Sequence, residues 1–359
     1  MDRERTETLI IGGGLSGLIA ARELAVRNKA FLLLEARDRP GGRILCPEYN
    51  GFSADLGPSW YWPDTNPALA SLVTELNLKS YPQFDHGLAR FQGKNGRVET
   101  VTGYPMVPQG RRLCGGMAAL TAALICQIPP DTIRFNSPVC EIQRLDSGIR
   151  VTVGRLDQEP DCRISAGQVI LALPPRLAAG SILFTPDLSH DLTQAMLRVS
   201  TWMAGHAKFF ALYDRAGWRK AGLSGQGFSL CGPLGEIHDG SGHRETVFGL
   251  TGFMGVPALR RKDEKTMVNA VLDQLETIYG PGAGCPLAVY YRDWAREPFT
   301  ATEYDQRSAH HHPEFHPPSG KTSIWGRTLH FAGSETADQS AGYLEGALLS
   351  GRRAVCAAL

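Results

Sequence analysis

The sequence lacks several features that would assign it to common functional classes. It has no apolar run of about 18 residues, the length needed to cross a bilayer, and its charged start, MDRERTET, leaves no room for a secretory signal. Its 37 basic and 36 acidic side chains give a formal net charge of +1, so there is no basic field for nucleic acid. Its eight cysteines include no CxxC pair. We therefore expect a cytoplasmic globular protein with reduced cysteines, no membrane partner and no nucleic-acid partner.

The sequence gives little support for a metal centre or a hydrolytic site. Four histidines fall within AHHHPEFHP (309–317), close to Glu314. The prolines and the lack of an i, i+4 histidine pair favour a surface loop over a set of metal ligands. Neither a Ser/His/Asp constellation nor a P-loop is recognisable in the sequence. We therefore predict no metal site.

The sequence is rich in glycine, with 40 residues concentrated at informative places. In TLIIGGGLSGLIAARELA (8–25), an apolar strand leads into Gly12-x-Gly14-x-x-Gly17, and apolar residues then recur at helical spacing. The first glycine suits a tight turn, the second a close approach to a pyrophosphate, and the third close packing of helix on strand. The helix N-terminus adds N–H groups for the phosphates. The pattern predicts a dinucleotide cradle, with a ligand-free glycine turn as the alternative.

A second strand, FLLLE (31–35), ends in an acid and strengthens the dinucleotide interpretation. Glu35 is placed to accept hydrogen bonds from a ribose, and its charge would repel a 2′-phosphate. Arg37 and Arg43 flank a glycine pair, where a guanidinium suits a second phosphate or the adenine side. ADLGPSW (54–60) predicts a further turn at which backbone approaches the ligand.

The middle of the chain predicts further helices and strands, without repeats or low-complexity segments. One helix is predicted from residue 66, and further helices over 115–126, 189–199 and 263–279. A hairpin is predicted at 88–101 around Asn95-Gly96. The predicted strands include two within 139–153 and others at 168–175, 207–213 and 245–253.

The end of the chain carries the most specific motif. YYRDWAREPFTATEY (290–304) precedes GRTLHFAGSETADQSAGYLEGALLSGRRA (326–354), in which a strand, a glycine turn and a helix follow one another. With the N-terminal cradle, these segments resemble the flavin-containing amine oxidases, the family of the monoamine and polyamine oxidases. The resemblance covers most of the chain and implies an α/β fold, in which a Rossmann-like FAD-binding domain of the glutathione-reductase type is interleaved with a substrate domain of mixed or antiparallel sheet. The FAD-binding domain would comprise residues 1–80, 111–174 and 295–359, and the substrate domain 81–110 and 175–294.

The resemblance also implies FAD as the cofactor. The helix that follows Gly342 would direct its N-terminus at the flavin and stabilise the negative charge that collects there on reduction. Glu303 stands where membrane-bound monoamine oxidases have the cysteine that bonds to flavin, so the FAD should be non-covalent. We expect the following residues to contact it: Gly12, Gly14, Ser16, Gly17, Glu35, Arg37, Gly42, Arg43, Gly57, Ser59, Val139, Trp294, Gly333, Ser334, Glu335, Gly342, Tyr343 and Leu344.

One charged residue, Lys208, interrupts the apolar strand AKFFALY (207–213). From the sequence alone it is either an edge residue that reaches solvent or a buried charge with a function. The resemblance favours the second alternative, because members of the family carry a lysine in a similar strand, hydrogen-bonded through water to the flavin N5. An ammonium there would stabilise negative charge while electrons pass to oxygen.

The resemblance assigns Tyr304 and Tyr343 to an aromatic cage in front of the flavin. Their faces would orient a neutral amine, and apolar surroundings would favour that form. Packing of the two tyrosines at a domain seam is the alternative. With Lys208 they would be the catalytic residues of an oxidase: an amine passes hydride to flavin N5, water hydrolyses the imine to a carbonyl compound, and oxygen is reduced to hydrogen peroxide. An amine and oxygen are thus the expected partners.

Other functions remain possible for the same fold. An amino-acid oxidase would need an arginine for the carboxylate, and Arg292 and Arg296 are candidates. A non-amine dehydrogenase and a flavin-binding redox module without turnover are further alternatives. The segment between Phe91 and Gly115 is far shorter than in the family, whose members place a long helical insert there over the cavity. We therefore expect a more open substrate site.

Overall fold

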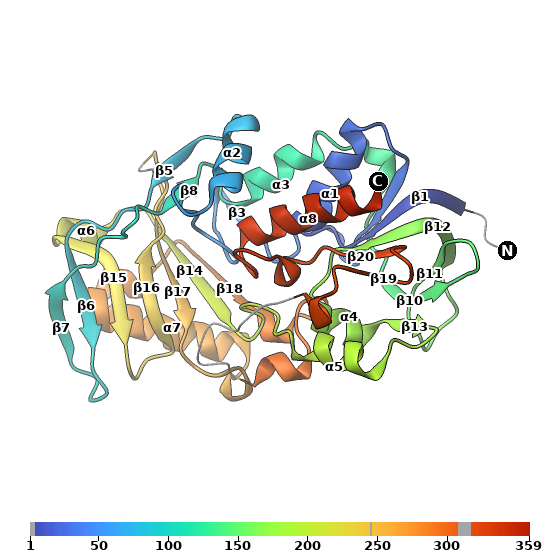
Figure 1. Ribbon diagram of the computed structural model, residues 1–359. Coiled ribbons are helices and arrows are strands. Elements are labelled where there is room, and N and C mark those ends of the chain that lie inside the picture. Colours follow the sequence, from blue (N-terminus) through green and yellow to red (C-terminus); the bar gives the residue numbers. More distant parts are fainter. Residues whose placement is uncertain (1–3, 245, 308–316) are drawn as a thin grey trace.

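The computed structural model describes residues 4–244, 246–307 and 317–359, which are built on two large sheets (Figure 1). The nine-stranded sheet contains β1 (Glu4–Ile11), β2 (Phe31–Leu34), β9 (Ile133–Arg134), β10 (Val139–Arg144), β11 (Ile149–Val153), β12 (Cys162–Leu171), β13 (Leu183–Thr185), β19 (Ser323–Ile324) and β20 (Leu329–Phe331). The seven-stranded sheet contains β6 (Leu88–Gln92), β7 (Val98–Thr102), β14 (Ala207–Tyr213), β15 (Leu223–Ser229), β16 (Leu234–Asp239), β17 (Phe248–Met254) and β18 (Ala288–Asp293). Two short pairs join β3 (Glu48–Tyr49) to β4 (Phe52–Ser53) and β5 (Ser80–Pro82) to β8 (Arg111–Leu113). The helices are α1 (Leu15–Val26), α2 (Pro67–Glu75), α3 (Ala118–Ile125), α4 (Pro175–Ser181), α5 (His190–Arg198), α6 (Gly217–Lys220), α7 (Glu264–Tyr279) and α8 (Leu344–Ala358).

The nine-stranded sheet has a parallel core. Strand β1 pairs in parallel with β2 on one side and with β12 on the other. The long strand β12 pairs with β11 along its first half and with β20 along its second. The last four residues of β1 and all of β2 are buried, as is typical of parallel strands covered on both faces. The carboxyl ends of these strands meet at one edge, where ligands bind in open α/β sheets.

Helices pack against the parallel core of this sheet. Apolar side chains of α1, α2, α3 and α8 form one core with it, and α1 and α8 lie side by side although they stand at opposite ends of the chain (Figure 1). The helices predicted from residue 66 and over 115–126, 189–199 and 263–279 are confirmed as α2, α3, α5 and α7. No helix in the described ranges is long and apolar enough to cross a membrane.

The predicted boundary at residue 175 needs correction. Strand β13 pairs with β10 of the nine-stranded sheet, and Leu192 and Met196 of α5 pack in a core shared with that sheet. The chain from α4 through α5 therefore packs with the nine-stranded sheet (the first lobe) rather than with the seven-stranded sheet (the second lobe). The physical reason is that its apolar side chains are needed to cover this side of the sheet, a demand that local sequence patterns do not reveal.

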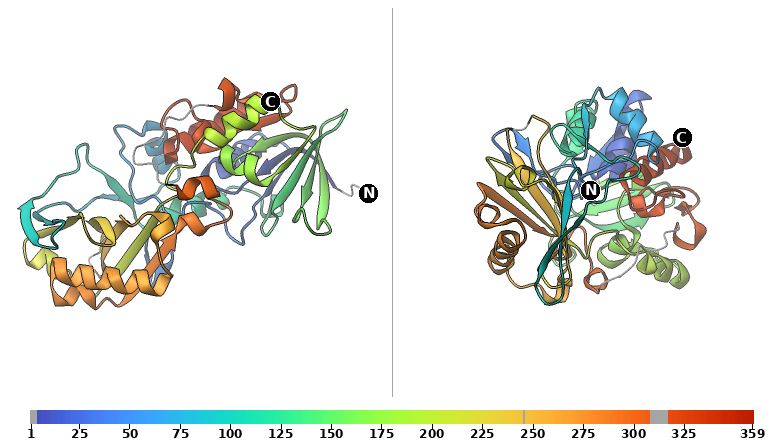
Figure 2. Two further views of the ribbon diagram at one scale, coloured as in Figure 1. Left: turned by 90° about the horizontal axis from the view of Figure 1, so that it is seen from below. Right: turned by 90° about the vertical axis from the view of Figure 1, so that its left-hand side faces the viewer.

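The seven-stranded sheet has the order β18-β14-β17-β16-β15-β6-β7 and is antiparallel except between β6 and β15. The hairpin predicted around Asn95-Gly96 is confirmed as β6 and β7. All seven residues of β14 are buried, because strands flank it on both sides and helix α7 contributes to the same core. Figure 2 shows α7 running along this sheet, away from the first lobe. The charged residue of β14 is thereby buried.

Candidate functional site

A cavity of about 330 Å³ is lined by residues from both lobes. It lies at the carboxyl ends of β1, β2, β12 and β20 and reaches β14 of the seven-stranded sheet. Most residues expected to contact a cofactor or substrate line it: Gly12, Gly14, Ser16, Glu35, Arg37, Gly42, Arg43, Gly57, Ser59, Lys208, Trp294, Gly333, Ser334, Gly342, Tyr343 and Leu344.

Four expected site residues are not among the residues that line the cavity. Gly17 lies beneath the glycine turn, and Glu335 is fully buried behind the wall. Val139 begins β10 and is not among the lining residues, and Tyr304 is 59% exposed. Gly17 and Glu335 therefore shape the wall rather than line it, whereas the expected flavin contact of Val139 and the expected substrate contact of Tyr304 stay predictions.

The glycine turn between β1 and α1 has the predicted geometry. Gly12 adopts φ +103°, and a Cβ there would stand 2.7 Å from the carbonyl oxygen of Ala172. A Cβ at Gly17 would overlap the carbonyl oxygen of Gly12, so only glycine lets α1 start this close to the turn. At Gly14 a Cβ would meet no protein atom within 4 Å. The backbone at Gly14 thus faces open space at the N-terminus of α1, which is the position of the pyrophosphate in a dinucleotide cradle.

The acid at the end of β2 is fixed by backbone donors. Glu35 is 3% exposed and accepts hydrogen bonds from the backbone N–H of Gly13 at 2.7 Å and of Arg37 at 2.9 Å. Arg37 donates from Nη2 to Thr300 at 2.8 Å, and burial lowers its pKa. Its buried Nε has no hydrogen-bond partner among the described residues. An unpartnered guanidinium donor beside this cavity fits a polar ligand, because buried donors are normally satisfied.

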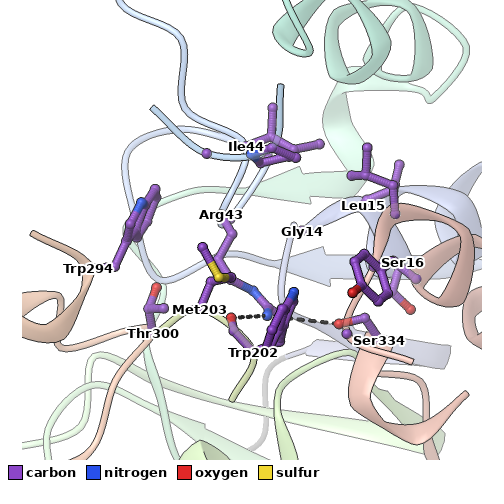
Figure 3. A pocket seen from close by; sticks show the side chains of 18 of the residues that line it. Gly14, Leu15, Ser16, Arg43, Ile44, Trp202, Met203, Trp294, Thr300 and Ser334 are labelled. Atoms are coloured by element: carbon purple, nitrogen blue, oxygen red, sulfur yellow. Dashed lines mark hydrogen bonds between the residues drawn. The ribbon is translucent and has the colours of Figure 1, made fainter. Parts of the chain in front are cut away.

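An ion pair joins the N-terminal and C-terminal motifs. Arg43 donates to Glu335 at 2.6 and 3.1 Å and to Ser334 Oγ at 2.9 Å. Burial by itself would raise the pKa of Glu335, but the guanidinium outweighs it and holds that pKa below its ordinary value. The same pair holds the backbone of Trp202, whose carbonyl accepts from Arg43 at 3.0 Å and whose N–H donates to Glu335 at 3.1 Å. Figure 3 shows Arg43 between Trp202 and Ser334.

Lys208 is a buried charge at the cavity wall. Its side chain is 2% exposed, and Nζ donates to the carbonyl of Gly57 at 2.7 Å and to Ser59 Oγ at 2.5 Å. Nζ also lies 5.6 Å from the ring centroid of Trp60 and 5.2 Å from that of Phe253. Burial lowers the pKa of Lys208 to about 8. An edge position in solvent, one of the two alternatives left by the sequence, is therefore wrong.

Within the described residues, the ring that lies beside that of Tyr343 belongs to Trp202 rather than to Tyr304. The centroids of the Trp202 and Tyr343 rings are 5.9 Å apart and their planes form an angle of 53°. Tyr304 is turned outward because its neighbour Asp305 is buried, where it accepts from Arg176 at 2.6 Å. In this short turn, the inward anchoring of one residue leaves the preceding side chain facing solvent.

Several cavity residues were not predicted. They are mostly aromatic or apolar and include Trp60, Trp62, Trp202, Met203, His206, Phe253, Phe299 and Thr300. Trp202 and Met203 stand in the loop that leads into the strand of Lys208, and this proximity was the available sequence signal. Phe253 faces Lys208 through a strand pairing that only the sheet register defines.

The described residues contain no cluster of three or more His, Cys, Asp or Glu side chains arranged to hold a metal ion. The histidine-rich segment lies almost entirely outside the described residues, so its predicted loop stays a prediction. All eight cysteines are free thiols.

Comparisons with known proteins give a consistent assignment. The chain is 24% identical to a probable flavin-containing monoamine oxidase A of Dictyostelium discoideum, over 97% of this chain and 96% of the relative. It is 23% identical to a putrescine oxidase of Kocuria rosea, over 98% and 95% of the two chains. A solved cyclohexylamine oxidase from Brevibacterium oxydans IH-35A superposes with a TM-score of 0.81 at 20% identity, covering 98% of each chain. A solved variant of putrescine oxidase gives a TM-score of 0.79 at 22% identity, again over 98% of each.

The family model described as flavin containing amine oxidoreductase matches residues 15–112 and 88–359, which together span most of the chain. This match shows the family and, with it, a flavin cofactor. The fold agrees with the predicted α/β architecture of two interleaved sheets. The chain belongs to the flavin-containing amine oxidoreductases, and its reaction is the flavin-dependent oxidation of an amine.

Proposed function

We propose that this chain binds FAD without a covalent bond and oxidises a neutral amine carried on an apolar group. The observation that carries the proposal is the cavity itself. One continuous cavity brings together a glycine turn at a helix N-terminus, an aromatic wall and the buried ammonium of Lys208. The wall around that ammonium is formed largely by aromatic rings, which suit an apolar substituent rather than a second charge.

The residues present fit FAD. The open backbone at Gly14 and the N-terminus of α1 offer a place for the diphosphate, and Glu35 keeps carboxylate lone pairs for a ribose. The unpartnered Nε of Arg37 is a further donor on this side of the cavity. At the other end, Gly342 precedes the N-terminus of α8, whose partial positive charge suits the pyrimidine end of a flavin. When bound, the flavin would supply the acceptor for the hydride and pass electrons on to oxygen.

The chain's own residues bind, orient and desolvate the amine. Tyr343 presents a ring at the cavity, and Trp60 and Phe253 line the region around Lys208. These apolar surroundings favour the neutral amine over the ammonium, because desolvation penalises the charged form. Hydride leaves more readily from the neutral form, so the protein's task is selection and orientation of that form rather than general-base catalysis.

Lys208 would act on the oxygen side of the reaction. Two of its three N–H groups are bound by Gly57 and Ser59, so one donor is left for a water molecule or for developing negative charge in the cavity. A fixed positive charge in a largely apolar wall stabilises developing negative charge more strongly than it would in water.

Non-covalent attachment is supported by the residue chemistry of the wall. The resemblance places Glu303 where membrane-bound monoamine oxidases have the cysteine that bonds to flavin. No cysteine is among the residues that line the cavity. The nearby thiol of Cys46 donates to Asp55 at 3.0 Å, and burial with this carboxylate raises its pKa, which keeps it unreactive.

The experiment is a visible spectrum of the purified protein, followed by anaerobic mixing with a panel of amines. We expect flavin bands that bleach with a monoamine on an apolar group and that are released as free FAD when the protein is precipitated with acid. Bleaching by L-amino acids alone would indicate an amino-acid oxidase. Flavin bands that no substrate bleaches would indicate a redox module without turnover, and flavin that stays with the precipitate would contradict non-covalent binding.

A further inference from the structure

The cavity contains one titratable side chain, that of His206, to which the proposed reaction gives no role. His206 is the residue before β14 and stands two positions from Lys208, and both residues line the cavity. Its ring nitrogen Nδ1 is buried and has no hydrogen-bond partner among the described residues. The other ring nitrogen, Nε2, is not among the buried atoms that lack a partner. Since no described residue bonds to Nε2, this nitrogen is open to a ligand in the cavity.

The backbone around His206 is held by hydrogen bonds from two other segments. The carbonyl of His206 accepts from the N–H of Trp294 at 3.0 Å. The preceding carbonyl, that of Gly205, accepts from the Arg261 guanidinium at 2.6 Å. Arg261 also pairs with Asp293, the residue before Trp294. These bonds fix the point at which the chain enters β14, and with it the place of the imidazole ring on the cavity wall.

The neighbours of His206 belong to the part of the wall assigned to the flavin. The centroid of the Trp202 ring lies 6.5 Å from that of the imidazole. Trp202 is held by Arg43 and Glu335, which come from the two motifs assigned to the cofactor. Trp294, an expected flavin contact, lines the same cavity (Figure 3). The imidazole is therefore placed where a bound flavin, rather than solvent, would be its neighbour.

The charges around His206 keep its ring neutral while the cavity holds no negative charge. Among the described residues, the charged groups on the surrounding segments are Arg261 and Arg296 with Asp293, Arg292 with Glu297, Arg43 with Glu335, and Lys208 without a carboxylate partner. Positive groups are thus in excess. Burial and the charge of Arg261 lower the pKa of His206. Negative charge that develops in the cavity would raise this pKa again, because it favours the protonated ring.

We propose that His206 contacts the bound flavin at Nε2 and gains a proton there when the flavin is reduced. The proton comes from water, and no bond between the protein and the flavin forms or breaks. Reduction brings negative charge into the cavity, and the imidazolium offsets it beside the ammonium of Lys208. The inference goes beyond the proposed function, because it applies whichever substrate supplies the electrons.

The test compares the holoenzymes of wild type, His206→Asn and His206→Leu. Asparagine keeps a hydrogen-bonding amide but cannot gain a proton, and leucine removes both properties. The reduction equilibrium of the bound flavin is measured without oxygen against a reference dye, with dithionite as the electron source, from about pH 5 to about pH 9. His190→Asn is a matched control, since His190 is exposed at the start of α5 and does not line the cavity.

Two additions isolate the effect of the imidazole. Each comparison is repeated in a Lys208→Met background, which removes the titration of the other cation in the cavity. Flavin content and near-UV circular dichroism verify that each variant is loaded and folded. If His206→Leu loses its flavin, His206→Asn decides the question.

We expect wild type, relative to His206→Asn, to favour the reduced flavin about tenfold more at pH 5 than at pH 9, which is about 30 mV for a two-electron couple. The reason is that the imidazolium present at low pH attracts the negative charge, whereas the neutral ring at high pH does not. The difference should persist in the Lys208→Met background. His206→Leu should lose the same pH dependence, and His190→Asn should follow wild type at every pH.

Equal pH dependence of flavin reduction in wild type and the His206 variants would overturn the proposal. A difference of constant size at every pH would overturn it as well, since the ring would then contact the flavin without gaining a proton. Failure of the proposed function has a separate signature, because dithionite rather than an amine supplies the electrons here. An enzyme that oxidises amines but shows no effect of His206 on its flavin refutes only this inference.

Discussion

Replacement of Lys208 by methionine should make the protein more stable at neutral pH while it slows the reaction with oxygen. Burial of the ammonium lowers the pKa of Lys208 from 10.5 to about 8, which corresponds to about 3 kcal/mol of folding free energy. Methionine removes that cost but leaves Gly57 O and Ser59 Oγ without their donor, at about 1 kcal/mol each. The expected net gain in free energy of unfolding at pH 7 is about 1 kcal/mol.

The pH dependence of this difference is more diagnostic than its size. Between pH 8 and 10.5 the unfolded lysine is protonated while the folded one is mostly neutral, so the unfolded state binds more protons and wild-type stability rises with pH. Lys208→Met has no such contribution. Its advantage should therefore shrink by about 2 kcal/mol between pH 7 and pH 9.5 and reverse in sign. Other titrating groups change equally in both proteins and cancel in the difference.

The assay is urea unfolding of both proteins, each loaded with flavin, at the two pH values. Oxygen reactivity is followed in parallel by mixing the reduced enzymes with oxygen. Wild type should reoxidise more slowly as pH rises above about 8, because the ammonium loses its proton, whereas Lys208→Met should be slow at every pH. A stability difference that does not vary with pH would refute the buried ammonium, and equal reoxidation rates would refute its catalytic role.

Two further sets of variants test the parts of the structure that hold the site. Gly17→Ala should lose several kcal/mol of stability and fail to retain flavin, because its Cβ would overlap the carbonyl of Gly12. Gly14→Ala should fold normally and lose only flavin binding, because its Cβ would enter the open cavity. Urea unfolding and flavin content distinguish the two variants, and a Gly14→Ala protein that keeps its flavin would contradict the assigned cradle. Glu345→Ala should lower the free energy of unfolding by about 2 kcal/mol, because the Glu345 carboxylate accepts hydrogen bonds from the free N–H groups at the start of α2, those of Ala68 at 2.9 Å and Leu69 at 2.7 Å. Glu345→Gln should recover part of this loss in the same unfolding assay. Equal stability of the two variants would argue against the cap.

Much of the site could be predicted because its parts are local. The turn at Gly12 needs a backbone conformation and a closeness of packing that only glycine allows, so this demand is visible in the sequence itself. The apolar strand around Lys208 and the strand-turn-helix motif before Tyr343 are likewise continuous segments, and most residues expected from them line one cavity. Glu345 was not predicted as a cap, because the N–H groups that it accepts, those of Ala68 and Leu69, lie 277 and 276 residues earlier in the chain.

The sequence by itself determined the dinucleotide turn, several of the helices and strands and the family resemblance, since each depends on residues a few positions apart. Only the tertiary structure decided which ring stands beside Tyr343, because the buried ion pair of Asp305 turns Tyr304 outward and the Arg43–Glu335 pair fixes Trp202. The tertiary structure also showed that the segment through α5 belongs with the nine-stranded sheet, because its apolar side chains cover the second face of that sheet. These outcomes depend on contacts between residues that are far apart in the chain, and a linear pattern carries no record of them.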